Sequence, residues 1–149
     1  MVQNRKAHHD YLILERMEAG IALMGTEIKS IRAGKANLQD AYAVVQEGEV
    51  WLRNSHISRY EAGSRFNHDP DRPRKLLLHK DEIRKLGQMI REKGLTVVPL
   101  QLYLKNNYAK VELALAKGKR QYDKREAIAK RDADRDVQRA IATSARNSS

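Results

Sequence analysis

The chain has 149 residues, a formal net charge of +10 and no cysteine. This length fits one domain with an appendage, and the lack of cysteine excludes disulfides and thiolate metal sites. The clustered excess of Lys and Arg favours a nucleic-acid-binding protein over a soluble protein that is merely basic. No stretch approaches the roughly 18 apolar residues of a membrane span, and the N-terminus lacks an apolar signal core, so we expect a cytoplasmic protein.

The first predicted element is a strand over residues 12–19. Its alternation places Ile13 and Met17 on one face and Arg16 and Glu18 on the other. A short helix is expected next. Thr26 is placed to cap it, the helix is expected to run through Arg32, and Gly34 is suited to terminate it.

A hairpin is predicted from residues 42–46 and 50–53, which flank Glu47-Gly48-Glu49. Trp51, the only tryptophan, is interpreted as a core or barrel-rim ring rather than a base-stacking residue. Residues 61–74 contain two prolines and no periodicity, which predicts a surface loop.

The best helix pattern follows residues 76–78, which close this loop. Its apolar face has the spacing i, i+3, i+4, i+7 and consists of Ile83, Leu86, Gly87 and Ile90. Glu82 is placed to support a cap at His79, and Gly94 to stop the helix.

A long second hairpin is predicted from residues 96–105 and 108–117, around Asn106-Asn107. Pro99 implies an edge or a bulge in its first strand. In its second strand Val111, Leu113 and Leu115 share one face, and Lys110, Glu112 and Ala114 share the other. Residues 1–117 are therefore expected to form a mainly β domain with short helices, a small antiparallel barrel of the oligonucleotide-binding type.

Residues 118–149 are predicted to form a separate basic tail, because their few sizeable apolar side chains cannot build a core. Their helix propensity is high, and Arg131, Arg135 and Arg139 would form one row along a helix. We expect this tail to be disordered when free and helical on a polyanion. Tyr122 stands among four cations, which favours an RNA clamp over a tail that only aids solubility.

Enzymatic alternatives are weak. His8-His9-Asp10, joined by His68-Asp69, could suggest a metal site or a nuclease base. Adjacent histidines of a strand, however, point to opposite faces. No Ser-His-Asp arrangement, phosphate loop or pair of carboxylates stands out. We expect no enzymatic activity, no metal and no cofactor.

The chain resembles the small protein B family over nearly its whole length. The matching strings are Asn4–Ala7, His9–Tyr11, Glu18–Gly20, Gly25–Arg32, Asn37–Tyr42, Asn67–Pro70, Arg74–Lys80 and Gly118–Arg125. The resemblance implies an oligonucleotide-binding-like barrel that binds the tRNA-like domain of transfer-messenger RNA (tmRNA) in trans-translation. It also implies a tail that enters the decoding centre and the empty mRNA channel of a stalled ribosome and folds there as a helix. The implied partners are tmRNA, small-subunit rRNA and, through the shared tmRNA, elongation factor Tu. The implied protein is a monomer without membrane contact or catalysis.

The resemblance also assigns candidate residues. Glu18, Leu77 and Lys110 match family positions tied to RNA binding. Glu18 and Lys110 lie on predicted outward faces, where a carboxylate can accept from a base or 2′-OH and an ammonium can meet phosphate. For Leu77 a place in the core is an equally good alternative. Weaker candidates are Asn4, Arg5, His9, Lys29, Arg32 and Lys35.

In the tail, Tyr122 matches the family's decoding-centre segment, where it is expected to stack on a small-subunit RNA base. The other residues assigned to the decoding centre or mRNA channel are Gly118, Lys119, Arg120, Asp123, Lys124, Arg125, Arg131, Arg135 and Arg139. Residues 143–149 match nothing that assigns them a role. A general RNA chaperone or ribosomal protein built on the same barrel is the second hypothesis.

Overall fold

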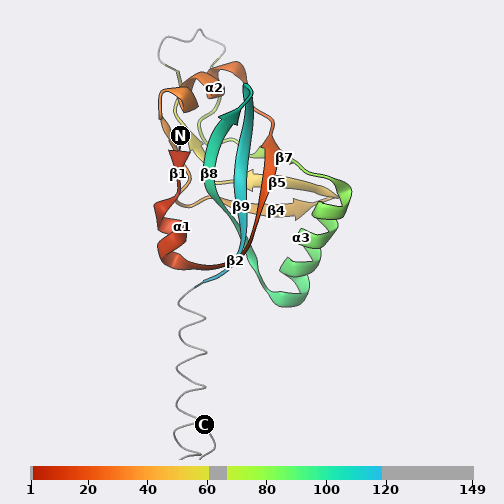
Figure 1. The fold of residues 1–149 in the computed structure, drawn as a ribbon. Coiled ribbons are helices and arrows are strands. Elements are labelled where there is room, and N and C mark those ends of the chain that lie inside the picture. The colour runs from red at the N-terminus through yellow and green to blue at the C-terminus, as the bar shows by residue number, and fades with distance from the viewer. Residues whose placement is uncertain (1, 61–66, 119–149) are drawn as a thin grey trace, which may run out of the picture. The chain divides into compact units, whose positions relative to one another are not determined.

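The computed structural model describes residues 2–60 and 67–118 (Figure 1). A seven-stranded sheet has the order β1-β8-β4-β5-β7-β2-β9 and closes through an additional pairing of β8 with β9. Its strands are β1 Val2–Gln3, β2 Tyr11–Ile21, β4 Tyr42–Gln46, β5 Glu49–Arg53, β7 Arg74–Leu77, β8 Thr96–Lys105 and β9 Tyr108–Gly118. The predicted small β-barrel with short helices is confirmed, and the predicted tail beyond Gly118 lies outside the described residues.

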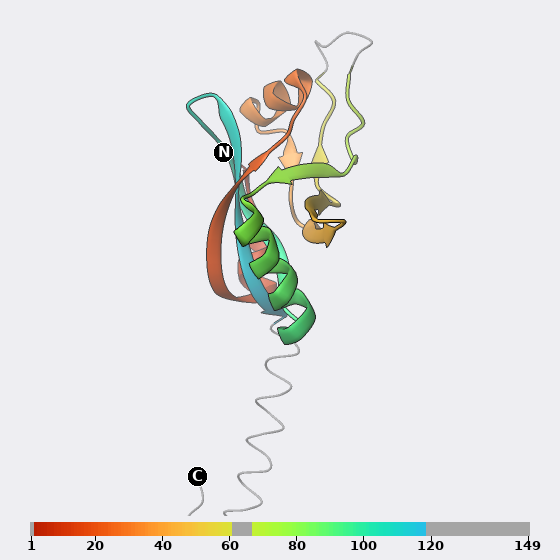
Figure 2. The ribbon, with the colours of Figure 1, turned by 90° about the vertical axis from the view of Figure 1, so that its right-hand side faces the viewer.

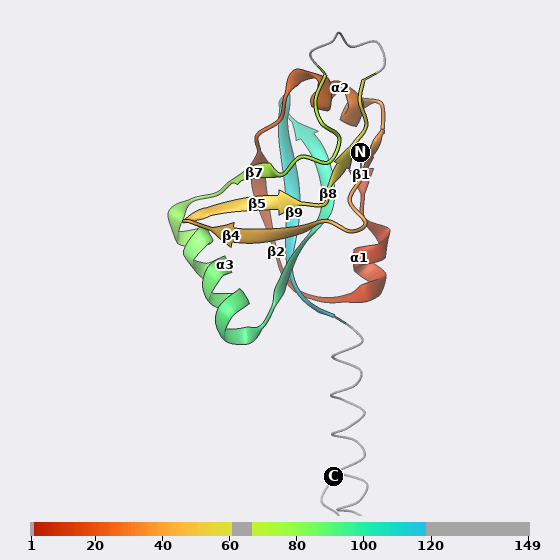
Figure 3. The same ribbon diagram turned by 180° about the vertical axis from the view of Figure 1, so that it is seen from behind.

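Three helices and a small second sheet complete the described fold. They are α1 Arg5–Asp10, α2 Gly25–Arg32, α3 Lys80–Lys93, and the pair β3 Ala36–Asn37 with β6 His56–Ile57. Figure 3 shows α3 beside β4 and β5, and α1 on the other side of the barrel. No helix of the described residues is both long and apolar enough to cross a membrane.

Both predicted hairpins are confirmed. Glu47 and Gly48 turn between β4 and β5 with φ of 52° and 76°. Asn106 and Asn107 turn between β8 and β9 with φ of 52° and 66°, which asparagine tolerates better than most residues. The β8–β9 register shifts just after Pro99, so the predicted bulge is also present. Figure 2 shows the tip of this long hairpin beside α2.

The helix α3 agrees closely with its prediction. The Glu82 carboxylate accepts from the His79 backbone N–H at 3.0 Å, and Gly94 ends the helix with φ of 62°. Leu86 is completely buried, while Ile83 and Ile90 pack against the same core. The periodic apolar face therefore holds α3 on the barrel, as expected of an amphipathic helix.

The helix α1 was not predicted. The first predicted element is the strand over residues 12–19, whereas the structure has a helix at Arg5–Asp10 before a strand that starts at Tyr11. The helix has six residues, of which only Ala7 is buried, so its sequence shows no apolar periodicity that would predict a helix. It packs against β8 and β2, and its Ala7 belongs to one buried cluster with Ala114 and Ala116 of β9, which are fully buried. Ala114 therefore lies on the face of β9 opposite Val111, Leu113 and Leu115, as predicted, and it is buried because α1 covers that part of the face.

Two further local predictions differ from the structure, at the cap of α2 and at the last residue of the loop 61–74. Met24, not Thr26, is the N-cap of α2, and the Glu27 carboxylate accepts from the Met24 backbone N–H at 2.7 Å. The predicted surface loop 61–74 ends in β7, whose Arg74 is completely buried. Gly34 does follow α2 with φ of 72°, as predicted. Trp51 is partly buried on β5, opposite Val44 of β4.

Candidate nucleic-acid interface

Glu18, Leu77 and Lys110 share one outer face of the barrel. They lie on β2, β7 and β9, and β2 is the strand between the other two. Gly20 pairs with Leu77 and lies two residues from Glu18, so Glu18 and Leu77 face the same way. Lys110 faces outward as well, because its two neighbours in β9 are buried. Leu77 is 52% exposed whereas its neighbour Leu76 is 2% exposed. The core alternative for Leu77 is therefore wrong.

Gly20 allows β7 to bring Leu77 close to β2. A Cβ atom on Gly20 would lie 3.1 Å from Cβ of Leu77, which is tighter than ordinary van der Waals contact. A larger residue would displace Leu77 or its strand. Sequence reasoning placed Glu18-Ala19-Gly20 among the matching strings but gave this glycine no role.

The Glu18 carboxylate is held by two residues of β8. The Tyr103 hydroxyl donates a hydrogen bond to Oε2, and Nζ of Lys105 lies 3.9 Å from the same oxygen. Lys110 pairs directly with Tyr103 across β8 and β9. Burial, together with the bond to Glu18 and the charge of Glu112, raises the pKa of Tyr103 to about 12. The phenol therefore keeps its proton at neutral pH and acts as a donor.

Tyr103 and Lys105 were missed by sequence reasoning, although a signal was present. Gln101, Tyr103 and Lys105 alternate with the apolar Leu102 and Leu104, so they occupy the outward face of β8. That face adjoins the predicted outward face of β9. An aromatic residue and a cation beside Lys110 are a combination that suits RNA.

Asn4 has a structural role. It is 1% exposed and its Oδ1 accepts from the backbone N–H of Ala7 at 3.1 Å, which caps α1. Its Nδ2 donates to the carbonyls of Leu38 at 2.9 Å and Pro99 at 2.8 Å. Because Asn4 is buried and both N–H groups of its amide are bonded, we correct its assignment and do not count Asn4 among the RNA contacts.

Arg5 and His9 are exposed on α1. His9 Nδ1 lies 2.9 Å from Oδ1 of Asp10. Because His8 and His9 belong to a helix, the argument that they point to opposite faces of a strand does not apply. Among residues 2–60 and 67–118, no group of three or more His, Cys, Asp or Glu side chains is arranged to hold a metal ion.

Lys29, Arg32 and Lys35 form an exposed basic group on and just after α2. Nζ of Lys29 lies 5.5 Å from the centre of the Tyr60 ring, a cation–π distance. Arg32 Nη2 donates to the side-chain oxygen of Asn107 at 3.2 Å. This basic group is therefore joined to the tip of the β8–β9 hairpin, near Lys105 and Lys110 of the same hairpin.

A buried charge cluster supports this end of the barrel. The Glu27 carboxylate is completely buried and accepts hydrogen bonds from Arg72 and, at 2.5 Å, from Nε of Arg74. Arg74 is also completely buried and donates to both the carbonyl and the hydroxyl of Ser55, at 3.0 and 2.9 Å. Sequence reasoning missed it because Glu27 and Arg74 are 47 residues apart.

Glu27 and Arg74 each affect the pKa of the other. Burial alone raises the pKa of Glu27, but the hydrogen bonds from Arg72, Met24 and Arg74 outweigh it, so the pKa lies below its usual value. Burial lowers the pKa of Arg74, and the bond to Glu27 opposes this only in part. Both groups are therefore charged at neutral pH, and each satisfies the other.

His68 ties the segment after the loop to α2. It is 2% exposed, its Nε2 lies 2.8 Å from the carbonyl of Ile57, and its Nδ1 lies 2.8 Å from the Thr26 hydroxyl. Because a carbonyl oxygen only accepts, Nε2 carries the proton. Thr26 thus stabilises a contact between distant segments rather than the start of its own helix.

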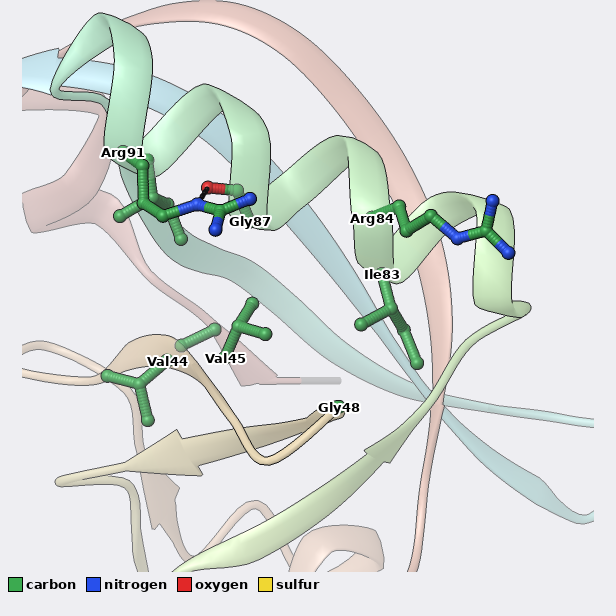
Figure 4. Close-up of a pocket in the computed structure, with 9 residues that line it drawn as sticks. Val44, Val45, Gly48, Ile83, Arg84, Gly87 and Arg91 are labelled. Atoms are coloured by element: carbon green, nitrogen blue, oxygen red, sulfur yellow. Dashed lines mark hydrogen bonds between the residues drawn. The ribbon is translucent and has the colours of Figure 1, made fainter.

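A cleft between α3 and the β4–β5 hairpin is a second surface feature (Figure 4). Its volume is about 480 Å³, and Val44, Val45, Ile83 and Ile90 line it. Its charged residues are Arg84 and Arg91, and Nε of Arg91 donates to the Gly87 carbonyl at 3.3 Å. None of the candidate residues predicted from the sequence lines this cleft.

The predicted tail residues, except Gly118, lie outside the described residues. Gly118 is the last residue of β9. The roles assigned to Lys119, Arg120, Tyr122, Asp123, Lys124, Arg125, Arg131, Arg135 and Arg139 therefore stay predictions.

Known proteins resemble this chain closely. Proteins named SsrA-binding protein are 64% identical in Carboxydothermus hydrogenoformans, over 95% of each chain, and 63% identical in Desulforudis audaxviator, over 93% of this chain and 90% of the relative. A solved structure described as "tmRNA-SmpB: a journey to the center of the bacterial ribosome" superposes with a TM-score of 0.67 at 55% identity. It covers 78% of this chain and 82% of its own. The family described as SmpB protein matches residues 1–143. This chain therefore belongs to the SmpB protein family.

Proposed function

We propose that this protein binds tmRNA and acts with it on the ribosome in trans-translation. Membership of the SmpB family, relatives named SsrA-binding protein and the similarity to a tmRNA–SmpB structure support this function. The observation that carries the proposal is the exposed face on which Glu18, Leu77 and Lys110 come together from three strands. The protein is an RNA-binding adaptor in this proposal, with no catalytic step of its own.

This face offers three kinds of contact to a folded RNA. The Glu18 carboxylate can accept from an exocyclic amine or a 2′-hydroxyl, and the ammonium of Lys110 can meet a phosphate. Leu77 supplies an apolar surface for a ribose or base. Because these groups are fixed on a closed sheet, they suit one RNA shape, here the tRNA-like domain of tmRNA.

Basic residues elsewhere on the barrel extend the contact. Arg5 and His9 on α1 are exposed, as are the three cations of the α2 group, Lys29, Arg32 and Lys35. Phosphate contacts of this kind add affinity and orientation without reading sequence.

The tail takes the second part of the function in this proposal. Residues 118–149 enter the decoding centre and the empty mRNA channel of a stalled ribosome and fold there as a helix. Tyr122 stacks on a small-subunit RNA base, and the arginine row Arg131, Arg135 and Arg139 contacts phosphates. Residues up to Lys117 form one compact unit, which supports a division into barrel and tail. The protein works in the cytoplasm as a monomer, and elongation factor Tu joins it through the shared tmRNA.

Competition with bulk tRNA tests the binding function. The purified protein is mixed with labelled tRNA-like domain at fixed salt, and unlabelled tRNA or tRNA-like domain is added. If the protein is a dedicated partner, only the unlabelled tRNA-like domain displaces the labelled RNA from it. Equal displacement by both RNAs would favour a general RNA chaperone, whose affinity is set mainly by salt.

Truncation after Lys117 tests the division of labour. We expect the shortened protein to bind the tRNA-like domain almost as well as the full chain and to lose all tagging on stalled ribosomes. Equal loss of both activities contradicts the two-part arrangement. Within the tail, Tyr122→Ala should impair tagging more than RNA binding, and Tyr122→Phe should restore it because the ring is retained. Failure of the phenylalanine variant would exclude stacking.

A further inference from the structure

Tyr103 reaches across a neighbouring strand to contact Glu18. It lies on β8 and Glu18 on β2, and β9 lies between these two strands in the sheet. Lys110 is the residue of β9 that pairs with Tyr103. The phenol ring therefore spans the position of Lys110 before its hydroxyl reaches Oε2 of Glu18. Tyr103 is thus bonded to one proposed RNA contact, Glu18, and is the strand partner of another, Lys110, although it is 85 residues from Glu18 in the sequence.

This contact fixes one oxygen of the carboxylate and leaves the other available. Oε2 of Glu18 accepts from Tyr103 and lies 3.9 Å from Nζ of Lys105. Within the part of the chain that the structure describes, Oε1 accepts no hydrogen bond, and the Glu18 side chain is 40% exposed. A flexible glutamate loses rotamer entropy when a ligand immobilises it, and a carboxylate that is already held loses less.

The tyrosine is well suited to hold this carboxylate. Its hydroxyl is a neutral donor at physiological pH, because burial and nearby carboxylates raise its pKa to about 12. Lys105 is a poorer anchor, since its side chain is 62% exposed and its ammonium is 3.9 Å away. Without the hydroxyl, Lys105 is the remaining group of the described residues that contacts Glu18.

We propose that Tyr103 is a positioning residue of the RNA-binding face, whose hydroxyl holds Glu18 so that Oε1 meets an amine or 2′-hydroxyl donor on the RNA. The proposal rests on the proposed function, because it assumes that Glu18 contacts RNA. It adds a residue that acts through Glu18, and it assigns the free oxygen Oε1 to the ligand.

The test is a double-mutant cycle on the full-length protein with the tRNA-like domain as ligand. Tyr103→Phe removes only the hydroxyl, and we expect about tenfold weaker binding, the scale of one hydrogen bond to a charged group. Glu18→Ala should weaken binding at least as much. The double variant should bind like Glu18→Ala alone, since Tyr103 then has no carboxylate to hold.

Two controls separate positioning from other roles. Tyr108→Phe loses the hydroxyl of a residue that is 72% exposed and whose hydroxyl makes no hydrogen bond within the described residues, so binding should not change. Thermal unfolding of each variant checks that the barrel is intact. The salt dependence of binding should keep its slope in Tyr103→Phe, whereas Lys110→Ala should reduce the slope by about one.

The outcomes distinguish this inference from the function on which it rests. The positioning role is overturned if Tyr103→Phe binds with wild-type affinity, or if it weakens binding equally in the Glu18→Ala variant. In either case a weaker affinity of Glu18→Ala itself leaves the binding function in place. Wild-type affinity of Glu18→Ala overturns both the positioning role and the contact through Glu18. The proposal is supported if Tyr103→Phe lowers RNA affinity when Glu18 is present and has no further effect in the Glu18→Ala variant.

Discussion

Replacing Glu27 with glutamine removes the negative charge that two arginines share inside the protein. Glu27 and Arg74 are both completely buried, and Arg72 is the second donor to the same carboxylate. Removing one partner of a buried ion pair leaves an uncompensated charge and costs about 3–5 kcal/mol. Glutamine retains an oxygen that can accept from the Met24 backbone N–H. We therefore expect a loss near the lower end, about 3 kcal/mol.

Urea unfolding measures this loss. With a slope of about 1.5 kcal/mol/M, typical of a small domain, the midpoint should fall by about 2 M. Glu15→Gln is the matched control, because its ion pair with Lys85 lies at the surface with both side chains more than 40% exposed. Such pairs contribute about 1 kcal/mol or less. If the free energy of unfolding of Glu27→Gln is within about 1 kcal/mol of the wild-type value, the buried pair does not stabilise this end of the barrel.

The pH dependence of the same difference gives an independent check. The folded pKa of Glu27 lies below its usual value of 4.5, so its charge stabilises the fold above that pH, and this stabilisation is lost as the pH falls through the folded pKa. The gap in unfolding free energy between the wild type and Glu27→Gln should be full at pH 7 and should narrow as the pH falls below about 4.5. A gap that stays constant down to pH 2 contradicts this explanation.

Three further substitutions test other parts of the structure. Gly87→Ala should raise the free energy of unfolding by about 0.5–1 kcal/mol, because alanine favours a helix interior and the new Cβ would lie 3.9 Å from Val45 Cγ1, an ordinary contact; a lower melting temperature would show that α3 cannot accept the methyl group. Asn4→Ala should cost about 2–4 kcal/mol in urea unfolding, since it removes a cap and leaves two buried carbonyls without a donor; unchanged stability with lost RNA binding would restore Asn4 as an RNA contact. Gly20→Ala should weaken binding of the tRNA-like domain more than Gly25→Ala, because its Cβ would crowd Leu77 at 3.1 Å whereas a Cβ on Gly25 meets nothing within 4 Å; equal effects would show that the position of Leu77 does not matter.

Elements with strong local signals could be predicted from the sequence. The apolar period of α3 with Glu82 and Gly94 at its ends, and the turn pair Asn106-Asn107, each lie within a few consecutive residues. The alternation of β2 and β9 likewise placed Glu18 and Lys110 on outer faces. These signals are local because hydrogen bonds within a turn or helix join near neighbours in the chain.

Features that depend on contacts between distant residues could not be predicted in this way. The helix α1 is only six residues long and depends on the cap by Asn4 and on packing beside Ala114. Its Asn4 amide is itself held by the carbonyls of Leu38 and Pro99. Asn4 therefore belongs to a string that matches the family, although in the structure it is a buried residue with a structural role.

The amino-acid sequence by itself determined the basic, cysteine-free character of the protein, its two hairpins, its main helix and the outward direction of Glu18 and Lys110. Only the tertiary structure decided that Arg74 is buried against Glu27, that Leu77 is exposed, and that Tyr103 holds Glu18. The physical reason is that alternation decides on which face of a strand a side chain lies. Burial and pairing, in contrast, depend on which distant strand or helix covers that face.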